Sequence, residues 1–185
     1  MGESLRGKLL VASLKLTDPN FARTVVLMCM HDEEGALGVV LNRPLGDEPV
    51  AGHLPHFGRL AAEPAVVFQG GPVEPGSALV LGKHAEGGAD RAANILTGRT
   101  ALLNLAVDVS EQEPPVEAVR VFAGYSGWTA GQLEAEIAEE AWFVVEPLEA
   151  EIWTAAPDLL WREVLRRQPG KLAMFAFAPA DPTVN

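Results

Sequence analysis

The strongest constraint on the fold is a pair of apolar segments separated by a short acidic turn. Residues 24–31, TVVLMCMH, form a nearly continuous apolar run, and residues 36–42, ALGVVLN, form a second. Such a short apolar run is typical of a strand that is buried on both faces. The intervening DEEG at residues 32–35 has the length of a hairpin turn. The sequence therefore predicts an antiparallel hairpin inside the molecule.

Further strands and helices are predicted on both sides of this hairpin. Apolar runs predict strands within residues 7–16, 65–84 (two strands with a Gly-Pro turn), 100–109, 118–125, 141–147 and 171–179. A helix is predicted at residues 157–168, with an apolar stripe of Leu160, Trp161, Val164 and Leu165. A second helix is expected after Thr129 and Gln132, which have the spacing of a capping box, and a short one within residues 50–62. Because strands occur in pairs and helices come late, we predict an α/β fold of the α+β type, with a mixed, largely antiparallel sheet.

Composition favours one domain covering residues 1–185, since 48% of the residues are hydrophobic and no long linker interrupts the chain. The formal net charge of −11 repels nucleic-acid phosphates, and no helix-turn-helix pattern is present, so we expect no direct nucleic-acid partner. The lone Cys29 cannot form an internal disulfide. No apolar run reaches the length of about 18 residues that a membrane span needs. We therefore expect a cytoplasmic protein without a membrane partner.

Ser126 lies between a predicted strand and a predicted helix, as the nucleophile of a Gly-x-Ser-x-Gly elbow does. The elbow requires a small residue two positions after the serine, where this chain has Trp128. The catalytic histidine of that fold follows the serine, whereas His31, His53, His56 and His84 all precede Ser126. We therefore favour an architectural turn, in which Gly124 and Gly127 permit a sharp bend and Trp128 packs against the core.

Two pairs of residues have the composition of a metal or catalytic site, His53 with His56 and Cys29 with His31. His53 and His56 are three residues apart, but Pro55 lies between them and no third ligand is near in the sequence, so solvated histidines in a surface turn are favoured. Cys29 and His31 should project from the same face of one strand, about 6.6 Å apart, which is too far for a direct hydrogen bond. A buried, inert thiol is favoured for Cys29. We expect no metal, no cofactor and no catalytic residue.

A candidate ligand-binding cleft is predicted where several turns meet the strand ends. In LNRPL, the proline holds Arg43 extended, a geometry suited to binding a carboxylate or phosphate. The favoured alternative is that Arg43 pairs with an acidic residue inside the fold. Polar edges of the NRP, GGP and GYS segments are expected to border one cleft. Its predicted residues are Asn42, Arg43, Gly70, Gly71, Tyr125, Ser126 and Trp128.

Four segments, taken together and in order, resemble the YqgE/AlgH family of bacterial proteins. They are GKLLVASLKLTDPNFARTVVLMCMHDEEGALGVVLNRPL, FQGGPVEP, VFAGYSGWTAGQLEAEI and LLWREVLRR, and the resemblance extends from Gly7 to about Asn185. The family pattern has Gly-Pro after the tryptophan, where this chain has Thr129 and Ala130. The resemblance implies a single-domain α/β fold whose bent sheet forms a pseudo-barrel, in a cytoplasmic bacterial protein. It supplies a suggested link to transcriptional regulation but no established reaction.

The functional expectation is a non-enzymatic binding or regulatory module that acts through a protein or a small ligand. Its basis is that Gly, Pro and Trp motifs dominate and no acid–base constellation appears. The alternative is a hydrolase or transferase of unknown substrate that uses Ser126 or a histidine cluster. The two differ in whether a histidine or carboxylate lies within hydrogen-bond reach of the Ser126 hydroxyl.

Overall fold

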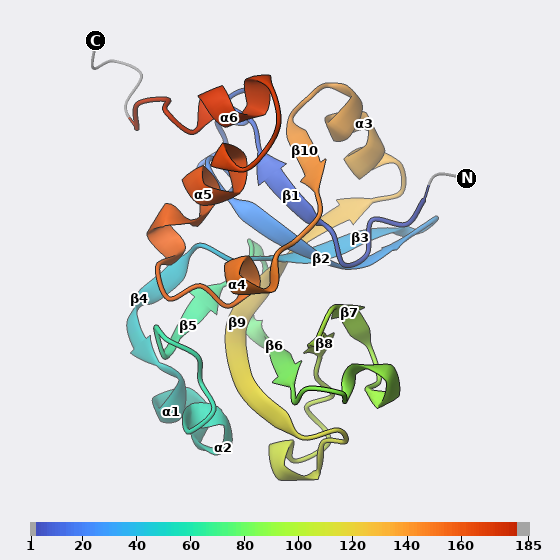
Figure 1. Cartoon of the computed structure of the whole chain (residues 1–185), viewed down its shortest axis with the longest axis vertical. Coiled ribbons are helices and arrows are strands. Elements are labelled where there is room, and N and C mark those ends of the chain that lie inside the picture. Colours follow the sequence, from blue (N-terminus) through green and yellow to red (C-terminus); the bar gives the residue numbers. More distant parts are fainter. Residues whose placement is uncertain (1–2, 181–185) are drawn as a thin grey trace.

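The computed structural model describes residues 3–180 (Figure 1). Residues 1–2 and 181–185, which the predicted domain includes, lie outside the described residues. The strands are β1 Leu9–Ala12, β2 Val25–Asp32, β3 Gly35–Val40, β4 Pro44–Pro49, β5 Val66–Gln69, β6 Val73–His84, β7 Ile95–Thr97, β8 Thr100–Leu102, β9 Val116–Thr129 and β10 Trp142–Val145. The α-helices are α1 Val50–His53, α2 Pro55–Gly58, α3 Gln132–Ala138, α4 Glu149–Ile152, α5 Leu160–Arg166 and α6 Lys171–Phe175. Short 3₁₀ turns occupy Ala89–Arg91, Val109–Glu111 and Pro157–Leu159.

The strands form one mixed sheet in the order β10-β1-β2-β3-β9-β6-β8-β7, with β5 attached to β9 and β4 attached to β5. All pairs of named strands are antiparallel except β5 with β9. The predicted α/β fold with a largely antiparallel sheet and a few flanking helices is therefore confirmed. The pseudo-barrel description is only loosely compatible, since β10 and β7 end an open path and the sheet does not close.

The predicted hairpin is present as β2 and β3, and both of its faces are covered. Along β1, Leu9 and Val11 belong to one apolar cluster, whereas Leu10 belongs to another on the opposite face. Along β2, Leu27 and Met28 separate in the same way. Strands covered on both faces need apolar residues at every position, which explains the unbroken run in the sequence.

A bulge in β2 corrects the predicted relation of Cys29 to His31. Met28 pairs with Gly38 and His31 with Ala36, so β2 advances three residues while β3 advances two. Gly38 and Ala36 share a face of β3, which puts Met28 and His31 on one face and Cys29 on the other. The strict alternation assumed from the sequence was wrong at this point because the bulge adds one residue.

Three apolar clusters make up the core. The first lies between the sheet and α4, α5 and α6. The second lies on the other face of β1 and β2, under α3, and contains two tryptophans. The third lies at the opposite end, where α1 and α2 cover β5, β6 and β9. The long β9 connects them, because it runs from the end that holds α1 and α2 to the end that holds α3 (Figure 1).

The sharp turn predicted around Ser126 was wrong. β9 continues through Ser126 to Thr129, and its residues change partner from β6 at Tyr125 to β3 at Ser126. Gly124 has φ +70° just before this change, and a Cβ atom there would lie 2.7 Å from the Gly71 carbonyl oxygen. The glycine therefore bends a strand that continues, instead of ending it.

The start of α3 differs from the predicted capping box. The helix begins at Gln132, and Gly131, with φ +75°, occupies the N-cap position. The Gln132 side chain accepts a hydrogen bond from the Thr129 N–H at 3.0 Å, which is half of the predicted reciprocal pair. The Thr129 hydroxyl lies 3.3 Å from the same Gln132 oxygen and does not reach a backbone N–H of the helix.

Other segments show where apolar pattern was misleading. Residues 171–179 were predicted as a strand, but Lys171–Phe175 is α6, packed on α5. The predicted helix at 157–168 is confirmed as a 3₁₀ turn followed by α5, and all four residues of its apolar stripe are buried. The predicted strands at 7–16 and 100–109 shrink to Leu9–Ala12 and Thr100–Leu102. Across residues 3–180, no helix combines the length and apolar character that crossing a membrane requires.

Candidate ligand-binding cleft

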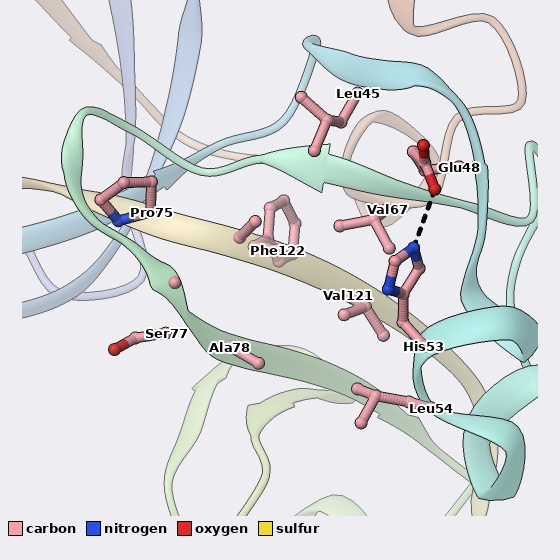
Figure 2. Close-up of a pocket in the computed structure, with 12 residues that line it drawn as sticks. Leu45, Glu48, His53, Leu54, Val67, Pro75, Ser77, Ala78, Val121 and Phe122 are labelled. Atoms are coloured by element: carbon pink, nitrogen blue, oxygen red, sulfur yellow. Dashed lines mark hydrogen bonds and ion pairs between the residues drawn. The ribbon is translucent and has the colours of Figure 1, made fainter.

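A cleft of about 470 Å³ opens between β4 and α1 on one side and the first half of β6 on the other (Figure 2). Its floor is formed by β5 and the middle of β9. The twelve lining residues are Leu45, Glu48, His53, Leu54, Val67, Pro75, Gly76, Ser77, Ala78, Val121, Phe122 and Ala123.

The floor is aliphatic because of the pairing around β9. Ala78 of β6 lies opposite Ala123 of β9, and these side chains share a face with Val121, two residues earlier. Val67 of β5 joins the same apolar cluster as Val121. The ring of Phe122 points to the opposite face, where it packs against Phe68 in the first cluster with ring centroids 5.9 Å apart.

Two interruptions in strand pairing leave room for the cleft. β4 pairs with β5 only at Pro44 and Pro49, with a register shift between them, and all six of its residues are exposed. β6 has a register shift between Val73 and Ala78 against β9. Glu74 within this shift has φ +46°, a left-handed conformation that is uncommon outside glycine and bends the strand. The walls therefore diverge instead of closing on each other.

The polar groups sit at two edges of the cleft. At one edge, His53 Nε2 lies 2.8 Å from Glu48 Oε2, as Figure 2 shows, and both side chains are 57% exposed. At the other edge, the Ser77 hydroxyl donates to Glu74 Oε2 at 3.3 Å. None of the twelve lining residues is Lys or Arg. The cleft thus has an aliphatic floor and a carboxylate near each edge.

The seven residues predicted to share one cleft lie in three separate places. Asn42 and Arg43 hold the turn between β1 and β2. The Asn42 side chain accepts from the Val25 N–H at 3.0 Å and donates to the Arg23 carbonyl at 2.9 Å. Arg43 donates to the carbonyls of Pro19 and Ala22 at 3.0 and 2.8 Å. The preference for a structural role of Arg43 was right in kind, but its partners are backbone carbonyls and not a carboxylate.

Gly70, Gly71, Tyr125 and Ser126 do come together, at a tight crossing of two backbones. A Cβ atom on Gly71, which has φ +156°, would lie 2.2 Å from the Tyr125 carbonyl, so no side chain fits there. Ser126 is fully buried, and its hydroxyl donates to the Gly70 carbonyl at 3.1 Å. That carbonyl also accepts from the Val40 N–H at 2.9 Å. These contacts hold the crossing closed, and ligand binding at these residues stays a prediction.

Trp128 belongs to an aromatic cluster instead of the cleft. Its ring lies 6.0 Å from that of Trp142, edge to face, and Phe21 packs on both. The two indole N–H groups donate to the same Glu136 oxygen, at 2.9 and 2.8 Å. The expectation that Trp128 packs against the core is confirmed, since 6% of its surface is exposed.

The histidines and the cysteine are separated in the fold. His31 accepts from the Leu5 N–H through Nδ1 and contacts Glu134, and His84 is buried against the Pro114 carbonyl. Among residues 3–180, no three His, Cys, Asp or Glu side chains converge in an arrangement suited to a metal ion. Cys29 is buried, as predicted, and this burial raises the pKa of its thiol to about 12; the low reactivity that follows stays a prediction.

Sequence reasoning missed the aliphatic floor of the cleft because its residues look like ordinary core. One available signal was the pair Pro44 and Pro49, which bracket a short strand and limit the hydrogen bonds it can make to a neighbour. Glu74-Pro75-Gly76 in β6 was a second such signal. Their meeting across the cleft depends on the parallel placement of β5 beside β9, which the sequence did not predict.

The open, mostly antiparallel sheet with its flanking helices makes this a small α/β protein, and comparisons with known proteins identify its family. The AlgH-like family model, DUF179, matches residues 9–173. The chain therefore belongs to the AlgH-like family, also called UPF0301.

Known members support this assignment. The chain is 49% identical to the UPF0301 protein SCO2948 of Streptomyces coelicolor, over 98% of this chain and 96% of that one. A crystal structure of DIP2367 from Corynebacterium diphtheriae is similar, with a TM-score of 0.86, 32% identity and coverage of 96% of this chain and 94% of that chain. The solution structure of AlgH from Pseudomonas aeruginosa is also similar, with a TM-score of 0.67, 29% identity and coverage of 98% and 100%.

Proposed function

We propose that this protein is a non-enzymatic binding module whose ligand occupies the cleft between β4 and β6. The observation that carries the proposal is the aliphatic floor of Val67, Ala78, Val121 and Ala123, which lines the cleft where two strands lose their regular pairing. A volume of about 470 Å³ falls within the range of about 300–1,000 Å³ found for small-ligand sites. Mostly apolar walls with a few polar groups are also typical of such sites.

The environment of Ser126 argues against its use as a nucleophile. Its hydroxyl is buried and donates a hydrogen bond to the Gly70 backbone carbonyl. A backbone carbonyl is too weak a base to remove the hydroxyl proton. An activated serine needs a general base at that position. A binding role is therefore favoured over acyl transfer through Ser126.

A second candidate function rests on His53. Its contact with Glu48 at the edge of the cleft resembles a general base oriented by a carboxylate, so a hydrolase or transferase activity remains the alternative proposal. The hydroxyl of Ser77, which also lines the cleft, donates to Glu74 and not to His53. The histidine therefore has no hydroxyl nucleophile bonded to it among the lining residues. Loss of a measured turnover in Glu48→Gln would favour this alternative.

Any regulatory role would run through a ligand or a protein partner. The net charge of −11 opposes direct contact with nucleic-acid phosphates, so a sequence-selective gel shift at about physiological salt would count against this view. A cytoplasmic site of action is part of the proposal, supported by the single cysteine, which needs no oxidising compartment.

The proposal is tested by filling the cleft. Ala78→Trp places a large ring on the same face as Val121 and Ala123, whereas Ala130→Trp adds the same ring at an exposed turn before α3. Amide chemical shifts in two-dimensional NMR are recorded during titration with a library of small aromatic compounds. We expect shifts at cleft residues in the wild type and in Ala130→Trp, and none in Ala78→Trp. Equal shifts in all three proteins would overturn the proposal.

A further inference from the structure

We infer that the cleft selects an apolar cation, a small molecule that joins an aliphatic or aromatic body to a protonated amine or guanidinium. The inference rests on the proposed function, because it names the ligand class of the same cleft.

The floor selects the apolar body. Val67 and Val121 are buried at 7% and 2% exposure, and together with Ala78 and Ala123 they present methyl groups to the cleft. Leu45, which is 41% exposed on β4, and Leu54, between α1 and α2, flank them. Leu45 and Ala78 are exposed, and covering their apolar surface with a ring removes it from water, which is the main favourable term in such binding. Nothing on the floor offers a hydrogen-bonding side chain to a polar body.

The edges select the positive charge. Glu48 lines one edge, and Glu74 lies beside Pro75 and Ser77 at the other. None of the twelve lining residues is Lys or Arg, and the basic side chain among them, His53, already contacts Glu48, so an anionic ligand would meet the Glu48 carboxylate in the cleft and the Glu74 carboxylate next to it. The net charge of −11 adds a field that attracts cations and repels anions.

Both carboxylates keep room for an incoming donor. Glu48 Oε2 carries the contact with His53, and Glu74 Oε2 accepts from the Ser77 hydroxyl. A carboxylate offers about four acceptor positions, so each of these bonds leaves capacity for an ammonium or guanidinium. His53 and Ser77 each contact one of the two carboxylates, and Figure 2 shows the contact between His53 and Glu48. Charge-assisted hydrogen bonds of this kind are stronger than neutral ones.

The test uses three probes with the same phenyl ring and different charge: phenethylamine, phenethyl alcohol and hydrocinnamate. Dissociation constants are measured from amide shifts of cleft residues in the wild-type protein. We expect the amine to bind about fivefold more tightly than the alcohol, the scale expected of partly exposed charge pairs, and hydrocinnamate to bind more weakly than the alcohol. High salt should reduce the preference for the amine, since exposed charges are screened.

Variants locate the charge selection. Glu48→Gln and Glu74→Gln should each lower the amine-to-alcohol ratio, and the double variant should bring it close to one while alcohol binding persists. Glu33→Gln, an exposed carboxylate in the β2–β3 turn, is the matched control and should leave the ratio unchanged. Retained alcohol binding also shows that each variant is folded.

The possible failures are distinguishable. If the amine and the alcohol bind equally in the wild type, or if Glu33→Gln lowers the ratio as much as Glu48→Gln, the charge selection is overturned and the binding cleft stands. If none of the three probes shifts the cleft amides, the proposed function fails together with the inference.

Discussion

The two ends of the sheet use the same strand, β9, in opposite ways. At the end formed by β1, β2, β3 and β10, here called the hairpin end, strands pair in nearly continuous register and all four residues of β1 are buried. At the end formed by β4, β5, the first half of β6, α1 and α2, here called the cleft end, pairing is interrupted and all six residues of β4 are exposed.

The contrast shows what interrupted pairing provides. Where the strands pair continuously, helices cover both faces of the sheet. The apolar side chains there are buried, and each buried apolar area adds to the stability of the fold. Where the pairing is interrupted, the apolar floor residues border a cleft that no side chain fills. We therefore expect substitutions at the hairpin end to change stability and substitutions at the cleft end to change binding.

The largest expected effect is that of Trp128→Ala at the hairpin end. The ring is 6% exposed and packs on Trp142 and Phe21, so its removal should lower the free energy of unfolding by about 3–5 kcal/mol. Urea denaturation gives this value. Leu45→Ala at the cleft end, with a side chain 41% exposed, is the comparison and should lose less than about 1 kcal/mol. Similar losses in both variants would abolish the proposed division.

Arg120 of β9, which is 2% exposed, is expected to give the next largest effect because its buried guanidinium is held by backbone carbonyls. Its guanidinium donates to the carbonyls of Ile152 and Thr154 at 3.0 Å and of Glu63 at 2.8 Å, and it lies 4.8 Å from the Phe68 ring. Burial lowers its pKa to about 10.

Arg120→Ala leaves three carbonyls without this donor and should cost about 3 kcal/mol in urea denaturation. Arg91→Ala, at an exposed position, is the control and should stay within about 0.5 kcal/mol. Wild-type stability in Arg120→Met, which keeps an apolar stem, would show that the carbonyl contacts contribute nothing.

Cys29 gives the hairpin end a dependence on alkaline pH. Burial raises the pKa of its thiol from the ordinary 9.0 to about 12 in the folded protein. The unfolded chain therefore loses this proton first, and the stability contribution, complete below pH 9, declines as the pH rises from 9 towards 12. At pH 10 the wild type should lose on the order of 1 kcal/mol relative to pH 8, beyond any loss in Cys29→Ala. Parallel pH profiles of the two proteins would contradict the assignment.

The same contrast explains what the sequence could predict. At the hairpin end, each strand is specified by its own apolar run, so the β2–β3 hairpin and the apolar stripe of α5 were predicted correctly. At the cleft end, the arrangement depends on β5 lying parallel to β9, a pairing between segments about 50 residues apart that no local pattern encodes.

The errors within the hairpin end have local physical causes. The glycines at 124 and 127 suggested a turn, but a single positive φ at Gly124 bends β9 without ending it. The apolar residues at 171–179 satisfied a strand pattern, and packing against α5 made part of this segment a helix. In both cases tertiary contacts determined the secondary structure, and the intrinsic propensities of the residues do not predict such contacts. Among the candidate residues, the sequence correctly indicated that Gly70 and Ser126 lie close together. It did not distinguish a tight backbone contact from an open binding site.

Ser126→Ala should have a small effect although the residue is fully buried. The lost hydroxyl hydrogen bond contributes about 1 kcal/mol, and the Gly70 carbonyl keeps its bond from the Val40 N–H, so no acceptor is left unpaired. A hydroxyl exposed to solvent at this position would instead predict almost no loss. Urea denaturation alongside Ser77→Ala, an exposed serine of the cleft, separates the two views. Identical losses for both serines would show that burial at the crossing contributes nothing.

The smallest expected effect on stability is at the edge of the cleft, and it tests the division most directly. His53 and Glu48 are each 57% exposed, and exposed ion pairs contribute little because water screens them and both side chains lose freedom when they pair. His53→Ala should therefore change the free energy of unfolding by less than about 0.5 kcal/mol. The same variant should alter phenethylamine binding, since Glu48 loses the group that orients it. A stability loss comparable to that of Trp128→Ala would mean that this contact supports the fold. An unchanged unfolding curve together with altered binding would establish that the interrupted end of the sheet serves the ligand and not the core.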